Sequence, residues 1–133
     1  MVKGEKMLSL NEFKGAKSAS MLFSKLFEAR DFAHKTHLAT KSYAQHKALN
    51  SFYEDVLDLA DQIIETYQGQ YGLVKIEFQS VKDAEVVSYF EDLAKFIIEG
   101  HNAFDKKDTH LHNILDELTS LTYGTLYKLK FLK

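Results

Sequence analysis

Two histidines and two carboxylates stand at spacings along the chain that suit a mixed metal site. They are His34, His46, Asp61 and Glu65. Imidazole nitrogen combined with carboxylate oxygen suits iron, zinc or manganese, whereas all-oxygen sites suit magnesium or calcium. The pattern therefore predicts a transition-metal site, provided that the four side chains meet in space.

Helical geometry limits how these side chains can meet. Asp61 follows His46 by 15 residues, a distance of about 22 Å along a helix that rises 1.5 Å per residue. His46 therefore cannot share a metal ion with the carboxylates of its own chain. A partner chain lying antiparallel across a two-fold axis would bring them together, because such an interface sets two different positions of one surface against each other. The site thus predicts at least a homodimer.

The spacing of the four residues resembles the ferroxidase ligand pattern of the Dps mini-ferritins, the DNA-protecting iron-storage proteins of starved bacteria. The likeness extends to Tyr43, to Gly69 after the glutamate, and to the run that begins with Asp108 and Thr109. The resemblance implies a ferritin-like four-helix bundle that binds iron, although the ligand set would suit zinc as well. It also implies assembly into homodimers and a twelve-subunit shell, and a role in oxidative stress.

The activity that the resemblance implies is oxidation of Fe(II) by peroxide or oxygen at a dimer-interface site. In this family the histidines come from one subunit and the carboxylates from the next. Neutral imidazole holds Fe(II), and carboxylate oxygens favour the Fe(III) product. The catalytic and metal-binding residues implied are His34, His46, Asp61 and Glu65.

Two neighbouring side chains are candidate accessory ligands. Asp58 lies one helical turn before Asp61, and His37 lies on nearly the same face as His34. Each of these residues also has an ordinary structural interpretation. A histidine on a helix is often only hydrogen-bonded, and a carboxylate there is often a solvated surface charge.

The composition is that of one soluble globular domain. The 133 residues are 45% hydrophobic and 27% charged, and they include no cysteine and no proline. The lack of cysteine excludes disulfides and thiolate metal sites, and the lack of proline favours long helices. No apolar run approaches the length of a membrane span, and the segment after Met1 lacks the apolar core of a signal peptide. We therefore expect a cytoplasmic protein without membrane association.

Charge is nearly balanced overall, but lysines gather at both ends of the chain. The formal net charge of −2 gives no general electrostatic reason to bind nucleic acid. The terminal lysines are Lys3, Lys6, Lys14, Lys17, Lys128, Lys130 and Lys133. They could hold DNA, as basic tails are thought to do in some Dps-like proteins, or they could simply be solvated. A DNA-coating module without ferroxidase activity is therefore one alternative function.

Apolar residues at helical spacing predict four helices. We expect them over about residues 18–38, 42–67, 80–103 and 108–129, after a flexible arm of residues 1–17 and around an irregular middle at 68–79. Ser42 with Gln45 forms a capping-box pattern, Gly69 is expected to end the second helix, and Ser80 to begin the third. The expected fold is an all-α, ferritin-like four-helix bundle over residues 18–133 with an irregular middle connection. Its expected core is Leu22, Leu26, Phe32, Phe52, Val56, Ile63, Phe90, Leu93, Ile97, Ile114, Leu118 and Leu121.

The rival function is a metal-free structural or interaction protein, because one bundle fold hosts many unrelated functions. It would assemble with itself or with a larger complex through aromatic surface residues. Those candidates are Tyr67, Tyr71, Tyr123 and Tyr127. The remaining histidines match no ligand spacing and are expected at helix ends; they are His101, His110 and His112.

Overall fold

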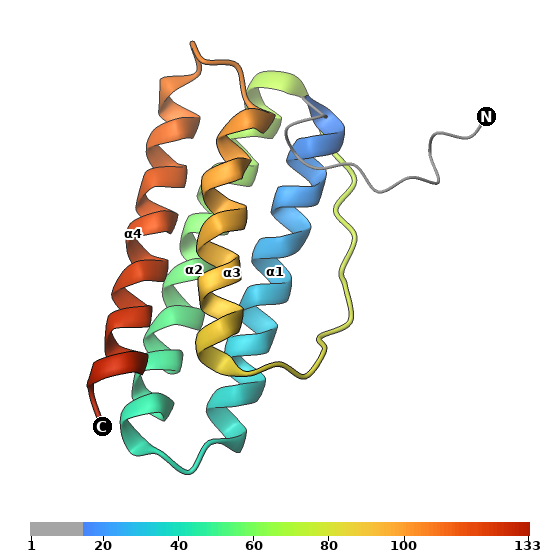
Figure 1. Ribbon diagram of the computed structural model, residues 1–133. Coiled ribbons are helices and arrows are strands. Elements are labelled where there is room, and N and C mark those ends of the chain that lie inside the picture. Colours follow the sequence, from blue (N-terminus) through green and yellow to red (C-terminus); the bar gives the residue numbers. More distant parts are fainter. Residues whose placement is uncertain (1–14) are drawn as a thin grey trace, which may run out of the picture.

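The computed structural model describes residues 15–133, which form four α-helices and one short 3-10 helix. The elements are α1 (Ala16–Ala39), α2 (Tyr43–Tyr71), α3 (Val86–Glu99), η2 (Gly100–Ala103) and α4 (Thr109–Phe131). The four α-helices stand side by side as a bundle (Figure 1), and residues 15–133 include no strand. The predicted all-α four-helix bundle with an irregular middle connection is confirmed.

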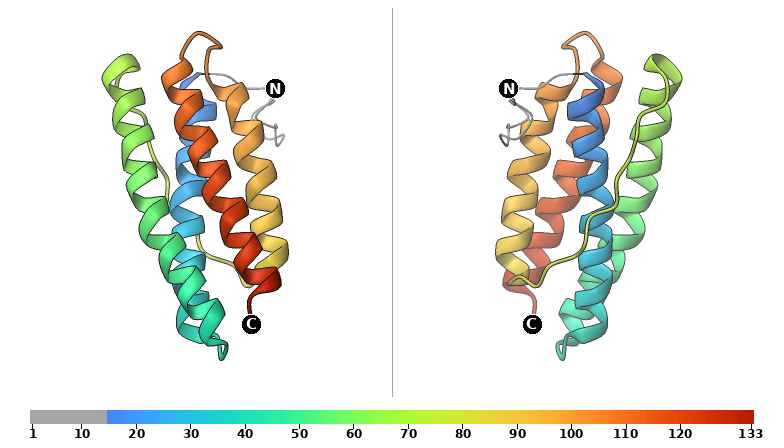
Figure 2. Two further views of the ribbon diagram at one scale, coloured as in Figure 1. Left: turned by 90° about the vertical axis from the view of Figure 1, so that its left-hand side faces the viewer. Right: turned by 90° about the vertical axis from the view of Figure 1, so that its right-hand side faces the viewer.

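The chain crosses the length of the bundle once without helical structure. Helices α1 and α2 form an antiparallel hairpin, and α3 and α4 form a second one. Helices α2 and α3 run in the same direction, so residues 72–85, which join them in the sequence, must return along the length of the bundle. These residues follow the outside of α1 (Figure 2). A single long connection of this kind is one of the standard ways of linking a four-helix bundle.

Three contacts hold this irregular connection against α1. The Ser20 hydroxyl donates a hydrogen bond to the backbone carbonyl of Lys75. Further along, the backbone N–H of Glu77 donates to the Ser24 hydroxyl at 3.1 Å. The rings of Phe27 and Phe78 lie 5.1 Å apart. The connection is therefore packed on the bundle although it is neither helix nor strand.

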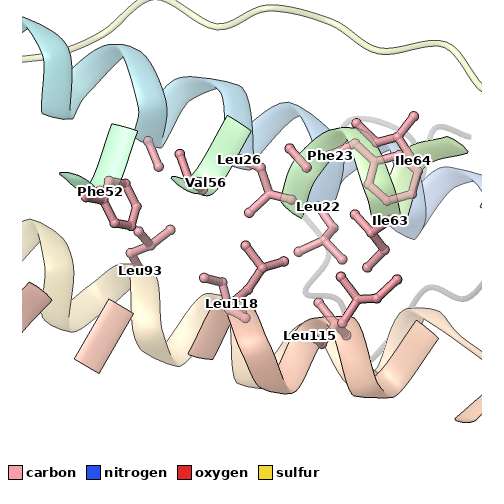
Figure 3. Close-up of a cluster of buried hydrophobic side chains, with 14 of the residues drawn as sticks. Leu22, Phe23, Leu26, Phe52, Val56, Ile63, Ile64, Leu93, Leu115 and Leu118 are labelled. Atoms are coloured by element: carbon pink, nitrogen blue, oxygen red, sulfur yellow. The ribbon is translucent and has the colours of Figure 1, made fainter. Parts of the chain in front are cut away.

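The core lies between the two hairpins and follows the sequence-based expectation closely. Leu22 and Leu26 of α1 point toward Leu118 of α4, and Phe52 of α2 points toward Leu93 of α3 (Figure 3). The remaining expected core residues are also buried, except Leu121, which is half-buried. Apolar side chains at helical spacing line one face of each helix, which is why the periodicity identified them.

Two of the expected helix boundaries are wrong. Helix α2 ends at Tyr71, and the left-handed residue after it is Gly72, with φ of 101°, whereas Gly69 lies within the helix. Helix α3 begins at Val86, because the Glu85 carboxylate accepts hydrogen bonds from the first backbone N–H groups of that helix. The serine expected to cap α3, Ser80, lies in the irregular connection.

The N-terminal arm expected over residues 1–17 is described only at its last residues. Helix α1 begins at Ala16, two residues before the expected domain boundary. Residues 1–14, and with them Lys3, Lys6 and Lys14, lie outside the described residues. Within residues 15–133, no helix is long and apolar enough to cross a membrane.

Candidate functional site

Two of the predicted histidines close the hairpin between α1 and α2. The rings of His37 and His46 are stacked with centroids 3.7 Å apart. The Nδ1 of His37 lies 2.7 Å from the backbone carbonyl of His46, and the Nδ1 of His46 lies 2.9 Å from the backbone carbonyl of His37. Because a carbonyl only accepts, both Nδ1 atoms must carry a hydrogen and donate it. A metal ion could therefore reach these rings only at Nε2.

His34 belongs to the same cluster but packs against an aromatic ring. Its imidazole stacks on Tyr53 at 4.3 Å and lies 6.0 Å from His37. Tyr53 in turn donates a hydrogen bond from its hydroxyl to the Asn50 side chain at 2.9 Å. The structure thus gives His34 an ordinary packing role between α1 and α2.

The predicted carboxylate ligands lie apart from these histidines. Asp58, Asp61 and Glu65 are exposed along α2, away from the hairpin turn that holds His37 and His46. Within residues 15–133, no group of three or more histidine, aspartate or glutamate side chains could hold a metal ion. As the helical rise required, one chain does not bring the two halves of the predicted site together. A site shared between two subunits stays a prediction.

Sequence reasoning missed a second pair of histidines. His101 of η2 and His112 in α4 lie across the connection between α3 and α4, and their Nδ1 atoms are 2.7 Å apart. The Nε2 of His112 lies 3.0 Å from the backbone carbonyl of Asp105, and the Nε2 of His101 lies 3.3 Å from the Asp116 carboxylate. The available signal was the placement of one histidine on each side of a predicted helix–helix turn, because such a turn brings its flanking residues together.

Asp108 occupies the expected N-cap position of α4 without capping the helix through its side chain. Its buried carboxylate instead accepts hydrogen bonds from the Tyr71 hydroxyl and, at 2.9 Å, from the Gln70 amide. These two hydrogen bonds hold the pKa of Asp108 below its usual value. The same contact raises the pKa of Tyr71 to about 12, so the hydroxyl remains a donor at neutral pH. The carboxylate therefore ties the end of α2 to the start of α4.

Aromatic side chains also form an exposed face on the last turns of α4. Tyr123, Tyr127 and Phe131 are 50%, 57% and 68% exposed and follow one another at intervals of four residues. They border a groove of about 660 Å³ between α3 and α4. Tyr67, which was expected to be a surface residue, is buried, and its ring packs against Phe23 at 5.7 Å. We call Tyr123, Tyr127 and Phe131, together with the groove that they border, the aromatic face.

The comparisons with known proteins assign a family. A model of the family DUF5856, described as a family of unknown function, matches residues 37–129. The chain belongs to this family. It is also 26% identical over 106 residues to a protein of Enterobacteria phage T4, described as an uncharacterized 14.6 kDa protein in the mobD-ri intergenic region. That similarity covers 78% of this chain and 81% of the phage protein, and no solved structure matches the chain significantly.

The resemblance to the Dps mini-ferritins is wrong, because the chain belongs to DUF5856, a family of unknown function. The physical reason is that side chains on a helical hairpin can reach such spacings through ring packing and backbone hydrogen bonds. Stacking accounts for His34, and reciprocal backbone hydrogen bonds account for His46. Ferroxidase activity, the twelve-subunit shell and a role in oxidative stress therefore lose the resemblance on which they rested. Iron or zinc binding at these residues stays a prediction.

Proposed function

We propose that this protein is a helical binding module that associates with a second copy of itself through the aromatic face. The observation that carries the proposal is the placement of Tyr123, Tyr127 and Phe131 along one exposed line of α4, while the opposite side of that helix packs in the core. Tyrosine and other large aromatic side chains contribute much of the binding energy in protein interfaces. A ridge of three such residues beside a groove is a surface suited to a protein partner.

The charges around the groove favour a second copy as that partner. Glu91 and Asp92 supply negative charge, Lys95 and Lys130 supply positive charge, and Lys130 pairs with Glu91 at 3.1 Å. A face of a single sign would repel its own copy, whereas a face that carries both signs can pair with itself across a two-fold axis. The ridge and the groove also lie on one face, so each copy offers the part that the other needs.

Another open face of the bundle lacks this balance. Asp55 and Asp58 of α2 and Glu117 of α4 border a hollow of about 390 Å³, together with Leu59, Ser120 and Leu121. Two copies meeting there would bring carboxylates of like charge together without a cation among the residues that line the hollow. Self-association is thus better supported at the aromatic face than at the acidic hollow.

DNA coating has less support from the described residues. The start of α1 and the end of α4 lie at opposite ends of the bundle (Figure 1), so lysines at these two places do not join into one basic patch on a single chain. Lys130 is also engaged with Glu91. DNA binding stays an untested prediction, and a steep loss of affinity with added salt would identify it.

The proposal is tested by sedimentation of the full chain over a wide range of concentration. We expect Tyr127→Glu to weaken self-association at least about tenfold, because it places a charge at the centre of an aromatic contact. Tyr43→Glu is the matched control, since Tyr43 is 75% exposed at the start of α2 and is not among the residues that border the groove, and it should leave self-association unchanged. A wild-type chain that stays monomeric throughout, or equal effects of the two substitutions, would overturn the proposal.

A further inference from the structure

The geometry of the pair formed by His101 and His112 is that of one strong hydrogen bond between two rings. The ring planes differ by 6°, and the centroids are 4.9 Å apart. The centroid separation is longer than the Nδ1 to Nδ1 distance of 2.7 Å by about two ring radii. Each Nδ1 atom therefore lies close to the line that joins the two ring centres, so the two nitrogen atoms point almost directly at each other. One Nδ1 must donate and the other must accept.

The hydrogen bonds of the two rings require three hydrogens on nitrogen, whereas two neutral imidazoles carry only two. The Nε2 of His112 faces a backbone carbonyl, and the Nε2 of His101 faces the Asp116 carboxylate. Both acceptors lack a hydrogen to give, so each Nε2 must carry its own. The contact between the Nδ1 atoms requires a third hydrogen. Three hydrogens on two rings correspond to one imidazole and one imidazolium, with a total charge of +1.

The surroundings disfavour a second charge on the pair. Burial lowers the pKa of His101, and the charge of His112 lowers it further, against the opposing effect of Asp116. Both effects disfavour a charged His101 beside a charged His112, so they favour a pair that holds one additional proton. The charged groups near the pair are Asp116 on α4 and Asp105 and Asp108 in the connecting turn, and the carboxylate of Asp108 also interacts with His112.

We propose that His101 and His112 form a proton-bridged clasp that fastens η2 to the first turns of α4 only while the pair carries one additional proton. With two neutral rings there are two hydrogens for three contacts, so one contact is lost. With two charged rings, both Nδ1 atoms carry hydrogens that point at each other, and the contact between the rings is lost. The clasp is therefore weakened on both sides of a window of pH, and with it the α3–α4 end of the bundle.

A divalent metal ion fits this arrangement poorly. Zinc binds imidazole at about 2.0–2.1 Å, so two imidazole nitrogens on one tetrahedral ion lie about 3.3 Å apart. The observed separation of 2.7 Å is shorter than that and is the length of a hydrogen bond. The geometry thus selects the proton as the occupant.

The test is a pH titration of the imidazole nitrogens of the full chain by ¹H–¹⁵N NMR from about pH 4.5 to about pH 9. We expect His101 and His112 to titrate in two linked steps, with an intermediate state that holds one shared proton. His101→Gln keeps hydrogen-bonding capacity without a titrating ring, so His112 should then titrate in a single step. His110→Gln is the matched control, because that ring bonds to Gln70 instead, and it should leave the two linked steps intact.

Thermal unfolding over the same pH range provides a second readout that does not depend on resolving individual nitrogens. We expect the difference in Tm between the wild type and His101→Gln to be largest within the window of pH. On each side of the window this difference should shrink by about 3 °C, as the loss of one hydrogen bond implies. Independent titration of the two rings would overturn the clasp, as would identical profiles of Tm against pH in wild type and His101→Gln. Both readouts are independent of the aromatic face, which lies toward the other end of α4.

Discussion

Two pairs of histidines fasten opposite ends of the bundle and make different demands for protons. His37 and His46 close the α1–α2 hairpin, whereas His101 and His112 close the α3–α4 hairpin at the other end (Figure 1). In the first pair each ring donates to the other residue's backbone carbonyl, so two neutral rings satisfy both hydrogen bonds. In the second pair the rings bond to each other, and a third hydrogen is required.

The difference shows that the groups facing a histidine decide its role more than its position does. Both pairs join neighbouring helices across a short connection, and both place their members about ten residues apart in the sequence. A backbone carbonyl is an acceptor at every pH, so the first pair serves as a fixed fastening. An imidazole can donate or accept, so the second pair depends on protonation.

The largest expected effect is at the fixed fastening. His37 is 6% exposed, donates to the His46 carbonyl and stacks on the His46 ring. We expect His37→Ala to lower the free energy of unfolding by about 2–3 kcal/mol, because it removes a buried hydrogen bond and a packed ring. Denaturation in urea measures the loss. Leu38→Ala is the control, since Leu38 is 72% exposed, and equal losses in the two variants would show that the first pair fastens nothing.

A smaller effect is expected at Asp108, the other titratable tie at the α3–α4 end. Asp108→Asn replaces an acceptor of two hydrogen bonds by an amide, and we expect a smaller loss of stability than for His37→Ala. Because the folded state lowers the pKa of Asp108, its contribution is present above its unfolded pKa of about 3.9 and is lost as pH falls through the folded value. The difference in Tm between wild type and variant should therefore shrink below about pH 4. A difference that stays constant down to pH 2 would contradict this account.

The smallest effect is expected at Asp61, and it separates the structural from the metal interpretation of the first histidine cluster. Asp61 is exposed, so Asp61→Ala should change the free energy of unfolding by less than about 0.5 kcal/mol in metal-free buffer. Thermal unfolding with added Fe(II) under anaerobic conditions, and separately with Zn²⁺, extends the comparison. If His34 and His46 have only their packing roles, neither metal should raise Tm of the wild type more than that of Asp61→Ala. A rise that requires Asp61 would instead establish a site shared between subunits.

The helices and the core could be predicted because they depend on periodicity. Leu22, Phe52 and Leu118 recur at helical spacing with their neighbours, and the structure buries all three. Ser42 was also identified correctly, since its hydroxyl accepts from the backbone N–H of Gln45 at 3.2 Å. Such features involve residues close in sequence, so a local pattern is sufficient to find them.

The boundaries of the irregular connection could not be predicted in this way. Gly69 and Gly72 are both able to end a helix, and Ser80 and Glu85 are both able to begin one. In the structure Gly72 ends α2 and Glu85 caps α3. The connection between them is held on α1 by contacts such as that of Ser24 with Glu77. Packing against a distant helix is not visible in a local pattern.

The candidate sites likewise combine features that follow from the local sequence with features that depend on tertiary packing. The sequence by itself determined four amphipathic helices, their shared core and the presence of histidines near the helix ends, because these follow from residue type and spacing. Only the tertiary structure decided that His37 bonds to backbone, that His101 bonds to another histidine, and that Tyr67 lies in the core. The physical reason is that hydrogen-bond partners and exposure depend on which surfaces meet, and separate helices meet only when the bundle is assembled.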